Sequence, residues 1–373
     1  WSYIIYLKTK KITIMRAFRL SLSIILLSNL VLIAQVDRSL PPKSGPPPEI
    51  NFGEPKEFIF ANGITLMVVE NPKLPRVSVS LRIDNPLYLS QDKTGVQSLL
   101  GIMLGKGSKN ISKDDFEEEI DFMGASLSFS SSSASAESLN RYFPRVFEMM
   151  ADAALNPNFL TEEFEKEKDK ILEGIKVSKK DVKAAARRVE NLLSYGRNHP
   201  YGEYASEKSI SRINLSDINE LYLERFSPKK AYIIVVGDID FETAQRLTQK
   251  YFGNWKKRNL NKSTFENPKN VNQTVIDFVE MPNAVQSEIS VLSTARIDKN
   301  NTDYYSLLIA NQILGGGAEA RLFLNLREDK GYTYGSYSRY SFNHKTKSRF
   351  RAYASVRNAV TDSSVLELLY EID

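Results

Sequence analysis

The sequence contains a strand-type run followed by an apolar helical run, and the same succession occurs again about 200 residues later. This repetition constrains the fold more than any other feature. A strand-type run at 70–83, ENPKLPRVSVSLRI, returns at 280–294 as EMPNAVQSEISVLST. An apolar helical run that ends in glycines at 96–107, VQSLLGIMLGKG, returns at 304–317 as YYSLLIANQILGGG. Self-similarity of this kind indicates a duplicated supersecondary unit. We therefore predict the α+β class with two duplicated domains, each an antiparallel-rich mixed sheet with helices packed on one side.

The length of 373 residues fits two domains, each large enough to bury its own core. The predicted segments are upstream translation at 1–14, a signal peptide at 15–34, a proline-rich spacer at 35–50, a first domain at 51–256, a linker at 257–273 and a second domain at 274–373. Because the sequence stops inside a predicted helix, we expect the second domain to be truncated.

The N-terminal region has the features of an export signal. From Met15 the sequence has two arginines, an apolar stretch from about Leu20 to Ile33, and then the small residue Ala34. This is the order of a secretory signal peptide. The apolar run is short and interrupted by serines, so an uncleaved membrane anchor is the less favoured alternative. We expect export to the periplasm, with membrane attachment only if the signal stays uncleaved.

Composition excludes several kinds of site. The sequence has no cysteine and only two histidines, His199 and His344, which excludes disulfides and a Cys/His metal cluster within one chain. His199 is interpreted as a loop histidine that caps local structure, and His344 as a surface residue. The formal net charge is +5 and no dense basic block occurs, so we expect no nucleic acid among the partners.

Local patterns predict most of the individual elements. Alternating apolar residues predict strands at 58–70, with Asn62-Gly63 as a hairpin turn, and at 76–84. The serine-rich stretch at 125–139 is typical either of a low-complexity linker or of a pair of polar strands, and strands are favoured. The charged stretch at 161–196 predicts a helical, solvated face. A buried strand at 231–240 closes the first domain, followed by a helix.

Several motifs occur together in an order that resembles the insulinase/pitrilysin family of zinc peptidases, whose active members carry His-x-x-Glu-His on a helix. The resemblance runs from about Phe58 to Asp373. It rests on the stretches GVQSLLGIMLGKGS, MGASLSFSSSSASAESL, LNPNFLTEEFEKEKDKILEGI, HPYG, SPKKAYIIVVGDID and LGGGAEARLFLNLREDKGYTYGSYS.

The resemblance places the family's zinc site on residues that cannot bind zinc. It puts Ser98 and Ile102 at the two histidines and Gly101 at the catalytic glutamate, and it puts Gly174 at the third ligand, a glutamate of a later helix. Zinc hydrolysis needs two imidazoles one helical turn apart and a carboxylate base, and none of these side chains supplies either. A register shifted by one would place Glu173 at the third ligand, where a lone carboxylate binds zinc weakly.

The motif of the second domain is nearly intact. In the family, an arginine and a tyrosine seven residues apart help to hold the peptide substrate, and by resemblance these are Arg327 and Tyr334. Arginine offers a planar fork of donors to a carbonyl or carboxylate, and a tyrosine hydroxyl can donate to an oxyanion. The alternative is a structural salt bridge for Arg327 and packing of Tyr334 in the sheet. Gly315, Gly316 and Gly317 correspond to a glycine-rich loop beside the family's substrate path, or they end a helix.

A lost metal motif beside a retained substrate motif predicts a catalytically incompetent subunit. We expect no catalytic residue and no cofactor in this chain, a heterodimer with a zinc-bearing homologous peptidase, zinc in that partner, and a peptide as substrate. The alternative is a non-enzymatic scaffold or peptide-binding subunit of an envelope complex. A homodimeric enzyme with some other chemistry is a third idea, which no Cys or Ser/His/Asp spacing recommends.

Overall fold

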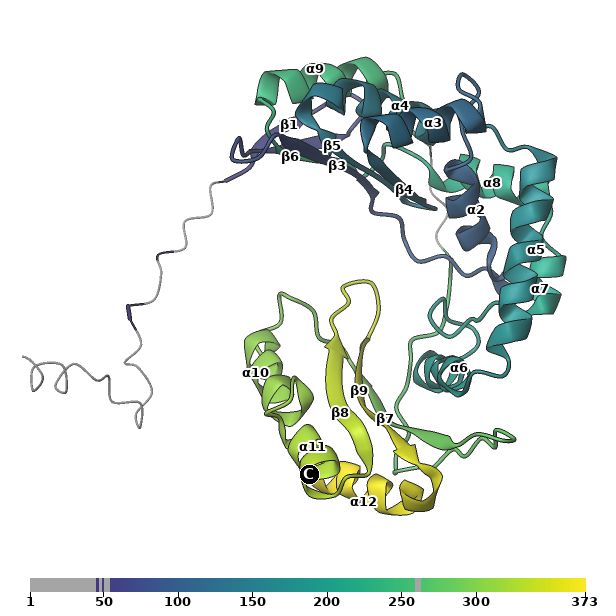
Figure 1. The fold of residues 1–373 in the computed structure, drawn as a ribbon, viewed down its shortest axis with the longest axis vertical. Coiled ribbons are helices and arrows are strands. Elements are labelled where there is room, and N and C mark those ends of the chain that lie inside the picture. The colour runs from purple at the N-terminus through teal and green to yellow at the C-terminus, as the bar shows by residue number, and fades with distance from the viewer. Residues whose placement is uncertain (1–44, 47–48, 50–53, 259–262) are drawn as a thin grey trace, which may run out of the picture. The chain divides into compact units, whose positions relative to one another are not determined.

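The computed structural model of the chain contains a sheet in the first half (Figure 1). Apolar and polar residues alternate along its strands β2 (Thr65–Glu70) and β3 (Arg76–Ile83), so one face of the sheet is buried. The structure describes residues 45, 46, 49, 54–258 and 263–373. The chain divides into the units Trp1–Gly53 and Glu54–Asp373, and the helices and strands of the described residues belong to the second unit. The predicted upstream segment and signal peptide lie outside the described residues.

The first sheet has six strands in the order β1-β2-β6-β3-β5-β4. Its strands are β1 (Lys56–Ile59), β2 (Thr65–Glu70), β3 (Arg76–Ile83), β4 (Ser126–Ser130), β5 (Ser133–Leu139) and β6 (Ala231–Gly237). Strands β2 and β6 are parallel and the other neighbours are antiparallel, so the sheet is mixed and antiparallel-rich, as predicted. The predicted buried strand, β6, lies in the centre of the sheet between β2 and β3.

Helices cover the apolar face of this sheet. The helices of the first half are α2 (Val96–Leu104), α3 (Lys113–Met123), α4 (Phe143–Leu155), α5 (Thr161–Ser178), α6 (Val182–Tyr195), α7 (Glu207–Ser211), α8 (Leu215–Arg225) and α9 (Phe241–Phe252). Short helical turns occur at η1 (Gln91–Lys93), η2 (Asn140–Tyr142) and, in the second half, η4 (Asn358–Val360). Helix α4 packs against β5 and α9 against β2, above the same face (Figure 1). In β3, Val77, Val79 and Leu81 are buried on this side, which follows from the period of two in a strand.

The serine-rich stretch forms the hairpin β4–β5, so the prediction of two strands is confirmed. Strand β4 is an edge strand, and its exposed serines face solvent. On β5, Ala134 and Ala136 are buried beneath α4, and their small side chains allow the helix to approach closely. The hydroxyls of Ser130 and Ser133 lie 2.7 Å apart and close the turn.

The charged stretch forms two helices, α5 and α6, and its interpretation as a purely solvated face is wrong at two positions. Glu167 on α5 is 6% exposed and forms ion pairs with Lys106 at 2.9 Å and Lys170 at 2.8 Å. Glu190 on α6 is 4% exposed. Both carboxylates are buried because another element covers them, which the spacing of charges in the sequence does not reveal.

The second half repeats the element order of the first. Its elements are β7 (Gln286–Ala295), α10 (Tyr304–Gly315), α11 (Arg321–Phe323), the π-helical turn η3 (Leu324–Asp329), β8 (Thr333–Ser341), β9 (Ser348–Arg357) and α12 (Thr361–Ile372). In the second half β7 is followed by α10, the β8–β9 hairpin and α12. In the first half β3 is followed in the same way by α2, the β4–β5 hairpin and α4. The antiparallel order β7-β9-β8 likewise matches β3-β5-β4, which confirms the duplicated two-domain architecture. Helix α9 ends at Phe252 and β7 begins at Gln286, while the exact domain limits stay a prediction.

Helix α6 of the first half packs against β7 of the second. Its buried Glu190 accepts hydrogen bonds at Oε1 from Ser290 Oγ at 2.6 Å and from Arg351 Nη2 at 2.9 Å. Next to it, Asn191 Oδ1 accepts from Arg349 Nη1 at 2.6 Å. These bonds satisfy Oε1 of Glu190, whereas its Oε2 is buried without a hydrogen-bond partner among the described residues. Within the described part of the chain, no helix has the length and apolar character needed to cross a membrane.

Candidate functional site

Two adjoining helices carry the four positions at which the resemblance expects a metal site. Ser98 is exposed, Gly101 buried and Ile102 half-buried on α2, where residues three and four apart lie on one side of the helix. Helix α5, which packs against α2, carries Gly174. The two helices that would carry such a site are therefore present, but the side chains at the four positions are not metal ligands.

Gly101 marks the place where the β4–β5 hairpin comes closest to α2. A Cβ atom at this position would lie 2.9 Å from the Cα of Ser130 and 3.3 Å from the backbone nitrogen of Ser131. Contacts below about 3 Å are not tolerated between a Cβ and backbone atoms, so any larger residue would have to displace the turn. The space that a glutamate would need at this position is filled by protein backbone.

Gly174 has a different environment. No atom lies within 4 Å of the place where its Cβ would be, and the residue is exposed. Its neighbour Glu173, the alternative in the shifted register, is an exposed carboxylate paired with Lys176 at 2.6 Å. This arrangement is that of an ordinary helical ion pair at the surface.

The residues at these positions do not fit zinc. Ser98, Gly101, Ile102 and Gly174 together provide one hydroxyl and neither an imidazole nor a carboxylate, which are the ligands that zinc prefers. Among residues 54–258 and 263–373, no group of three or more His, Cys, Asp or Glu side chains is arranged to hold a metal ion.

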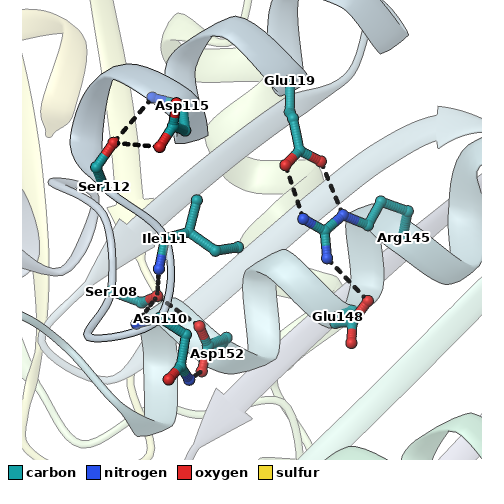
Figure 2. Close-up of polar contacts among 9 residues, drawn as sticks. All are labelled: Ser108, Asn110, Ile111, Ser112, Asp115, Glu119, Arg145, Glu148 and Asp152. Carbon is teal, nitrogen blue, oxygen red and sulfur yellow. Dashed lines mark hydrogen bonds and ion pairs between the residues drawn. The ribbon is translucent and has the colours of Figure 1, made fainter.

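The loop that follows α2 has structural contacts of its own, which explain why the outline of the motif persists (Figure 2). Ser108 is 2% exposed, and its Oγ accepts hydrogen bonds from the backbone nitrogens of Asn110 at 3.1 Å and Ile111 at 3.0 Å. The same hydroxyl donates to the carboxylate of Asp152 on α4, which also accepts from Asn110 Nδ2 at 2.7 Å. The hydrogen bonds of Ser108 thus connect the loop after α2 to α4 without any metal.

Helix α3 is attached to α4 by a fork of ion pairs (Figure 2). Arg145 donates from Nε and Nη2 to the two carboxylate oxygens of Glu119 at 2.8 and 2.7 Å, and from Nη1 to Glu148 at 3.0 Å. The bidentate bond to Arg145 lowers the pKa of Glu119 below its ordinary value. Ser112 is the N-terminal cap of helix α3, because its Oγ accepts from the backbone nitrogen of Asp115 at 3.2 Å.

Arg327 and Tyr334, the pair suggested by the second-half motif, lie side by side. Arg327 belongs to the π-helical turn η3, a rare conformation that occurs frequently at functional sites. Its Nη1 donates to the backbone oxygen of Tyr334 at 2.8 Å, and its Nε donates to Glu328 at 3.0 Å. The guanidinium also lies over the ring of Phe323, 5.3 Å from its centre. The ion pair to Glu328 is exposed and contributes little to stability.

Tyr334 does not pack in the sheet, so that part of the alternative is wrong. Its side chain is 85% exposed. The register between β8 and β9 shifts between Thr333 and Ser336, and Thr333 Oγ1 donates to the backbone oxygen of Ser355 at 2.7 Å across this irregularity. Such a bulge re-aims the neighbouring side chain, here that of Tyr334, away from the sheet.

The three glycines at the C-terminal end of α10 have separate structural roles. A Cβ at Gly315 would lie 2.2 Å from the backbone nitrogen of Ser338, so this glycine lets α10 end directly against β8. Gly316 is the C-terminal cap of the helix, and the Cβ of Gly317 would meet open space apart from Gln312. None of the three has a positive φ.

His199 is fully buried beneath the turn that it caps. Its Nδ1 accepts a hydrogen bond from the backbone nitrogen of Tyr201 at 3.0 Å, and its Nε2 lies 2.9 Å from Thr346 Oγ1 in the β8–β9 loop. The ring stacks on Tyr195, and burial lowers the pKa of the imidazole. His344 has a 69% exposed side chain and is a surface residue.

Sequence reasoning missed the polar residues of the second sheet that face α6. A signal for them was present in SRFRAYASVR at 348–357, where Arg349 and Arg351 alternate with Phe350 and Ala352. Alternation places both arginines on one face of a strand, opposite the apolar core. Their partner Glu190 could not be found in this way, because it lies 161 residues away from Arg351.

Comparison with known families places both halves in one group. Residues 66–203 match the insulinase family, peptidase family M16, and residues 212–373 match the peptidase M16 inactive domain.

Three curated relatives illustrate the match. An uncharacterized zinc protease of Bacillus subtilis, YmxG, is 23% identical over 297 residues, covering 77% of this chain and 70% of that protein. An uncharacterized zinc protease of Mycobacterium tuberculosis is 24% identical over 251 residues, covering 65% of this chain and 57% of that protein. The mitochondrial-processing peptidase subunit alpha of Solanum tuberosum is 26% identical over 206 residues, covering 51% of this chain and 39% of that protein. The chain thus spans little more than half, or less, of the last two relatives.

Solved structures share the fold. A peptidase M16 inactive domain from Pseudomonas fluorescens superposes with a TM-score of 0.76 at 22% identity, covering 86% of this chain and 78% of that one. The periplasmic protease PqqL from Escherichia coli superposes with a TM-score of 0.66 at 16% identity, covering 86% of this chain and 37% of that one.

Proposed function

The chain belongs to the insulinase family of peptidases, peptidase family M16, and from this premise we propose that it is a non-catalytic subunit of a peptidase pair. A zinc-bearing homologue would provide the metal and the hydrolytic chemistry. This chain would provide substrate-binding residues from its second half. The observation that carries the proposal is the contrast between Gly101, whose side-chain space is filled by backbone, and the exposed Arg327–Tyr334 pair.

Arg327 and Tyr334 are suited to holding an extended peptide. Two of the arginine nitrogens, Nε and Nη1, are held by Glu328 and by the backbone of Tyr334, which fixes the plane of the guanidinium. The remaining Nη2 has no partner among the described residues and is a donor for a peptide carbonyl or carboxylate. The phenol of Tyr334 lies on an exposed ring and is a second donor for a peptide oxygen.

Two of the comparisons favour a paired, exported protein. The potato relative is, by its name, one subunit of a processing peptidase. The Escherichia coli structure is that of a periplasmic protease, which agrees with the export signal predicted at 15–34. We infer a heterodimer in the periplasm that acts on peptides.

The proposal is tested by mild affinity purification of the tagged, full-length protein from its own host, followed by mass spectrometry, zinc analysis and a peptide-cleavage assay. We expect a near-stoichiometric homologue with the His-x-x-Glu-His motif, roughly one zinc per pair, and cleavage that a chelator abolishes. Zinc-dependent cleavage by this chain purified alone would contradict the proposal. Elution with unrelated envelope proteins, without metal or activity, would favour a scaffold.

A further inference from the structure

One face of the second sheet is lined with arginine and tyrosine. Strand β9 buries every second residue, including Phe350, Ala352 and Ala354, against the core of the second half. The residues between them lie on the opposite face, where β8 contributes the matching side chains. This cationic face consists of Tyr337, Arg339, Arg349, Arg351 and Tyr353.

The cationic face brings like charges together. Arg339 on β8 is directly opposite Arg351 on β9, and Arg349 lies one step along the same strand. Like charges directly opposite in a sheet are destabilising unless an anion lies between them. Among the described residues, only Arg351 of the three has a carboxylate within ion-pair distance, that of Glu190. Arg349 is held by a neutral amide, Asn191, and Arg339 is exposed. Strand β7 adds one carboxylate to the same face, that of Glu288, which accepts a hydrogen bond from Ser355 at 2.6 Å and forms no ion pair with these arginines among the described residues. The positive charges of Arg339 and Arg349 are therefore not paired with a carboxylate.

A row of aromatic rings connects this face with the Arg327–Tyr334 pair. The rings of Tyr353 and Tyr337 have centres 6.1 Å apart, and those of Tyr337 and Phe323 are 5.9 Å apart. Phe323 in turn lies under the guanidinium of Arg327. A peptide held by Arg327 can continue over these rings onto the arginines.

We propose that the cationic face binds the acidic side chains of an extended peptide, so that segments rich in aspartate and glutamate are the preferred substrate class. This inference rests on the proposed function, because it assumes that Arg327 and Tyr334 hold the same peptide. An arginine fork matches a carboxylate with two parallel hydrogen bonds. Arg339 and Arg349 have no carboxylate partner among the described residues, so these two arginines are the proposed ligands for the acidic side chains, while Arg351 stays paired with Glu190.

The test measures direct binding by the purified full-length chain. Three fluorescein-labelled peptides of equal length carry glutamate, glutamine or lysine at alternate positions, with glycine and serine between them. Fluorescence anisotropy is expected to give the lowest Kd for the glutamate peptide, about tenfold below the glutamine peptide, and the highest for the lysine peptide. Raising the salt concentration is expected to weaken binding of the glutamate peptide selectively, because screening acts on exposed charges.

Substitutions in the cationic face test whether the glutamate peptide binds there. Arg339→Gln and Arg349→Gln are each expected to raise the Kd of the glutamate peptide about fivefold or more, while Arg339→Lys retains most of the affinity. Arg339→Glu should shift the preference towards the lysine peptide. The matched control is Arg246→Gln, which removes an exposed arginine of α9 and should change nothing. Arg351 is left unchanged, because its removal would leave Glu190 buried without a cation.

Equal binding of the three peptides would overturn the inference. So would unchanged binding of the glutamate peptide in the Arg339→Gln and Arg349→Gln variants, with circular dichroism showing intact folds. These results concern the chain alone, so they do not depend on whether a zinc-bearing partner is found. If the purified pair cleaves peptides and the glutamate peptide shows no preference, only the substrate class is wrong.

Discussion

The Nη1 of Arg327 donates a hydrogen bond of 2.8 Å to the backbone oxygen of Tyr334. The bond joins the π-helical turn η3 to the first residues of β8, where the strand register is irregular. It fixes the backbone of Tyr334 and leaves its ring exposed. Arg327 therefore has a structural contact as well as a nitrogen, Nη2, without a partner among the described residues, whereas the phenol of Tyr334 forms no hydrogen bond with any of these residues.

Because only Arg327 has a structural contact, substitutions of Arg327 and Tyr334 should differ in their effect on the stability of the chain. Tyr334→Phe removes one hydroxyl from an exposed ring, and the free energy of unfolding should change by less than about 0.5 kcal/mol. In the reconstituted pair the same variant should lower kcat/KM about 100-fold, the effect of losing one oxyanion donor. Arg327→Ala should lower kcat/KM as well and also destabilise the chain by about 1 kcal/mol, because the bond to the Tyr334 backbone is lost.

Steady-state kinetics of the pair and thermal unfolding of the chain together check this prediction. Wild-type turnover of the Tyr334→Phe pair would show that the phenol does not contact the substrate. Assembly, measured by size-exclusion chromatography, should be the same for wild type and both variants.

Gly101 and Gly174 are both inside helices, yet alanine should have opposite effects at the two positions. At Gly101 the new methyl group would lie 2.9 Å from the Cα of Ser130, and overpacking of this kind costs about 1–3 kcal/mol. At Gly174 the methyl group would enter open space, and alanine should stabilise helix α5 by about 0.5–1 kcal/mol. Urea denaturation of Gly101→Ala and Gly174→Ala measures both effects with one method, and each variant is the control for the other.

A stronger form of this test restores the ligands of the family motif. The combined variant Ser98→His, Gly101→Glu, Ile102→His and Gly174→Glu should unfold at a lower temperature than the wild type and should fail to bind zinc stoichiometrically, because the hairpin occupies the space for the glutamate. Wild-type stability together with one bound zinc would mean that the hairpin moves away easily.

His199 should make the stability of the chain dependent on pH. Burial lowers the pKa of its imidazole in the folded state, while the unfolded chain has the ordinary value of about 6.5. Below this pH the unfolded state binds a proton that the folded state excludes. The contribution of His199 to stability is therefore constant above about pH 6.5, falls as the pH decreases, and levels off below the lowered pKa of the folded state. The groups packed around the ring are Tyr195, Tyr201, Phe265 and Thr346.

Thermal unfolding between pH 8 and pH 5 in the wild type, His199→Gln and His344→Gln measures this effect. The fall in Tm towards pH 5 should be smaller in His199→Gln than in the wild type. His344→Gln removes an exposed histidine and should follow the wild-type curve. An unchanged pH dependence in His199→Gln would mean that other groups cause it.

The duplicated architecture was predictable because it depends on local periodicity, and residues such as Val77 and Val79 alternate with serines whatever lies around them. The strands at 125–139 could be recognised for the same reason. The filling of the Gly101 position was not predictable, since it depends on how near the turn at Ser130 comes to α2. The burial of Glu190 likewise depends on α6 meeting β7, and the opposition of Arg339 and Arg351 depends on strand register. A local sequence pattern does not show which distant segments come into contact, so these three features could not be predicted.

Ser108 provides the last prediction, which concerns the retained outline of the metal-binding helix. If the GKGS loop has a structural role, Ser108→Ala should destabilise the chain by about 2–3 kcal/mol, because two backbone nitrogens and the carboxylate of Asp152 lose their buried partner. Ser128→Ala on the exposed edge strand β4 is the matched control and should change stability by less than about 0.5 kcal/mol. Equal unfolding midpoints in urea for the two variants would contradict the structural role. A large loss at Ser108 alone would explain why the chain keeps this loop although the residues of the zinc site are gone: the loop joins α2 to α4, and that connection is needed with or without a metal.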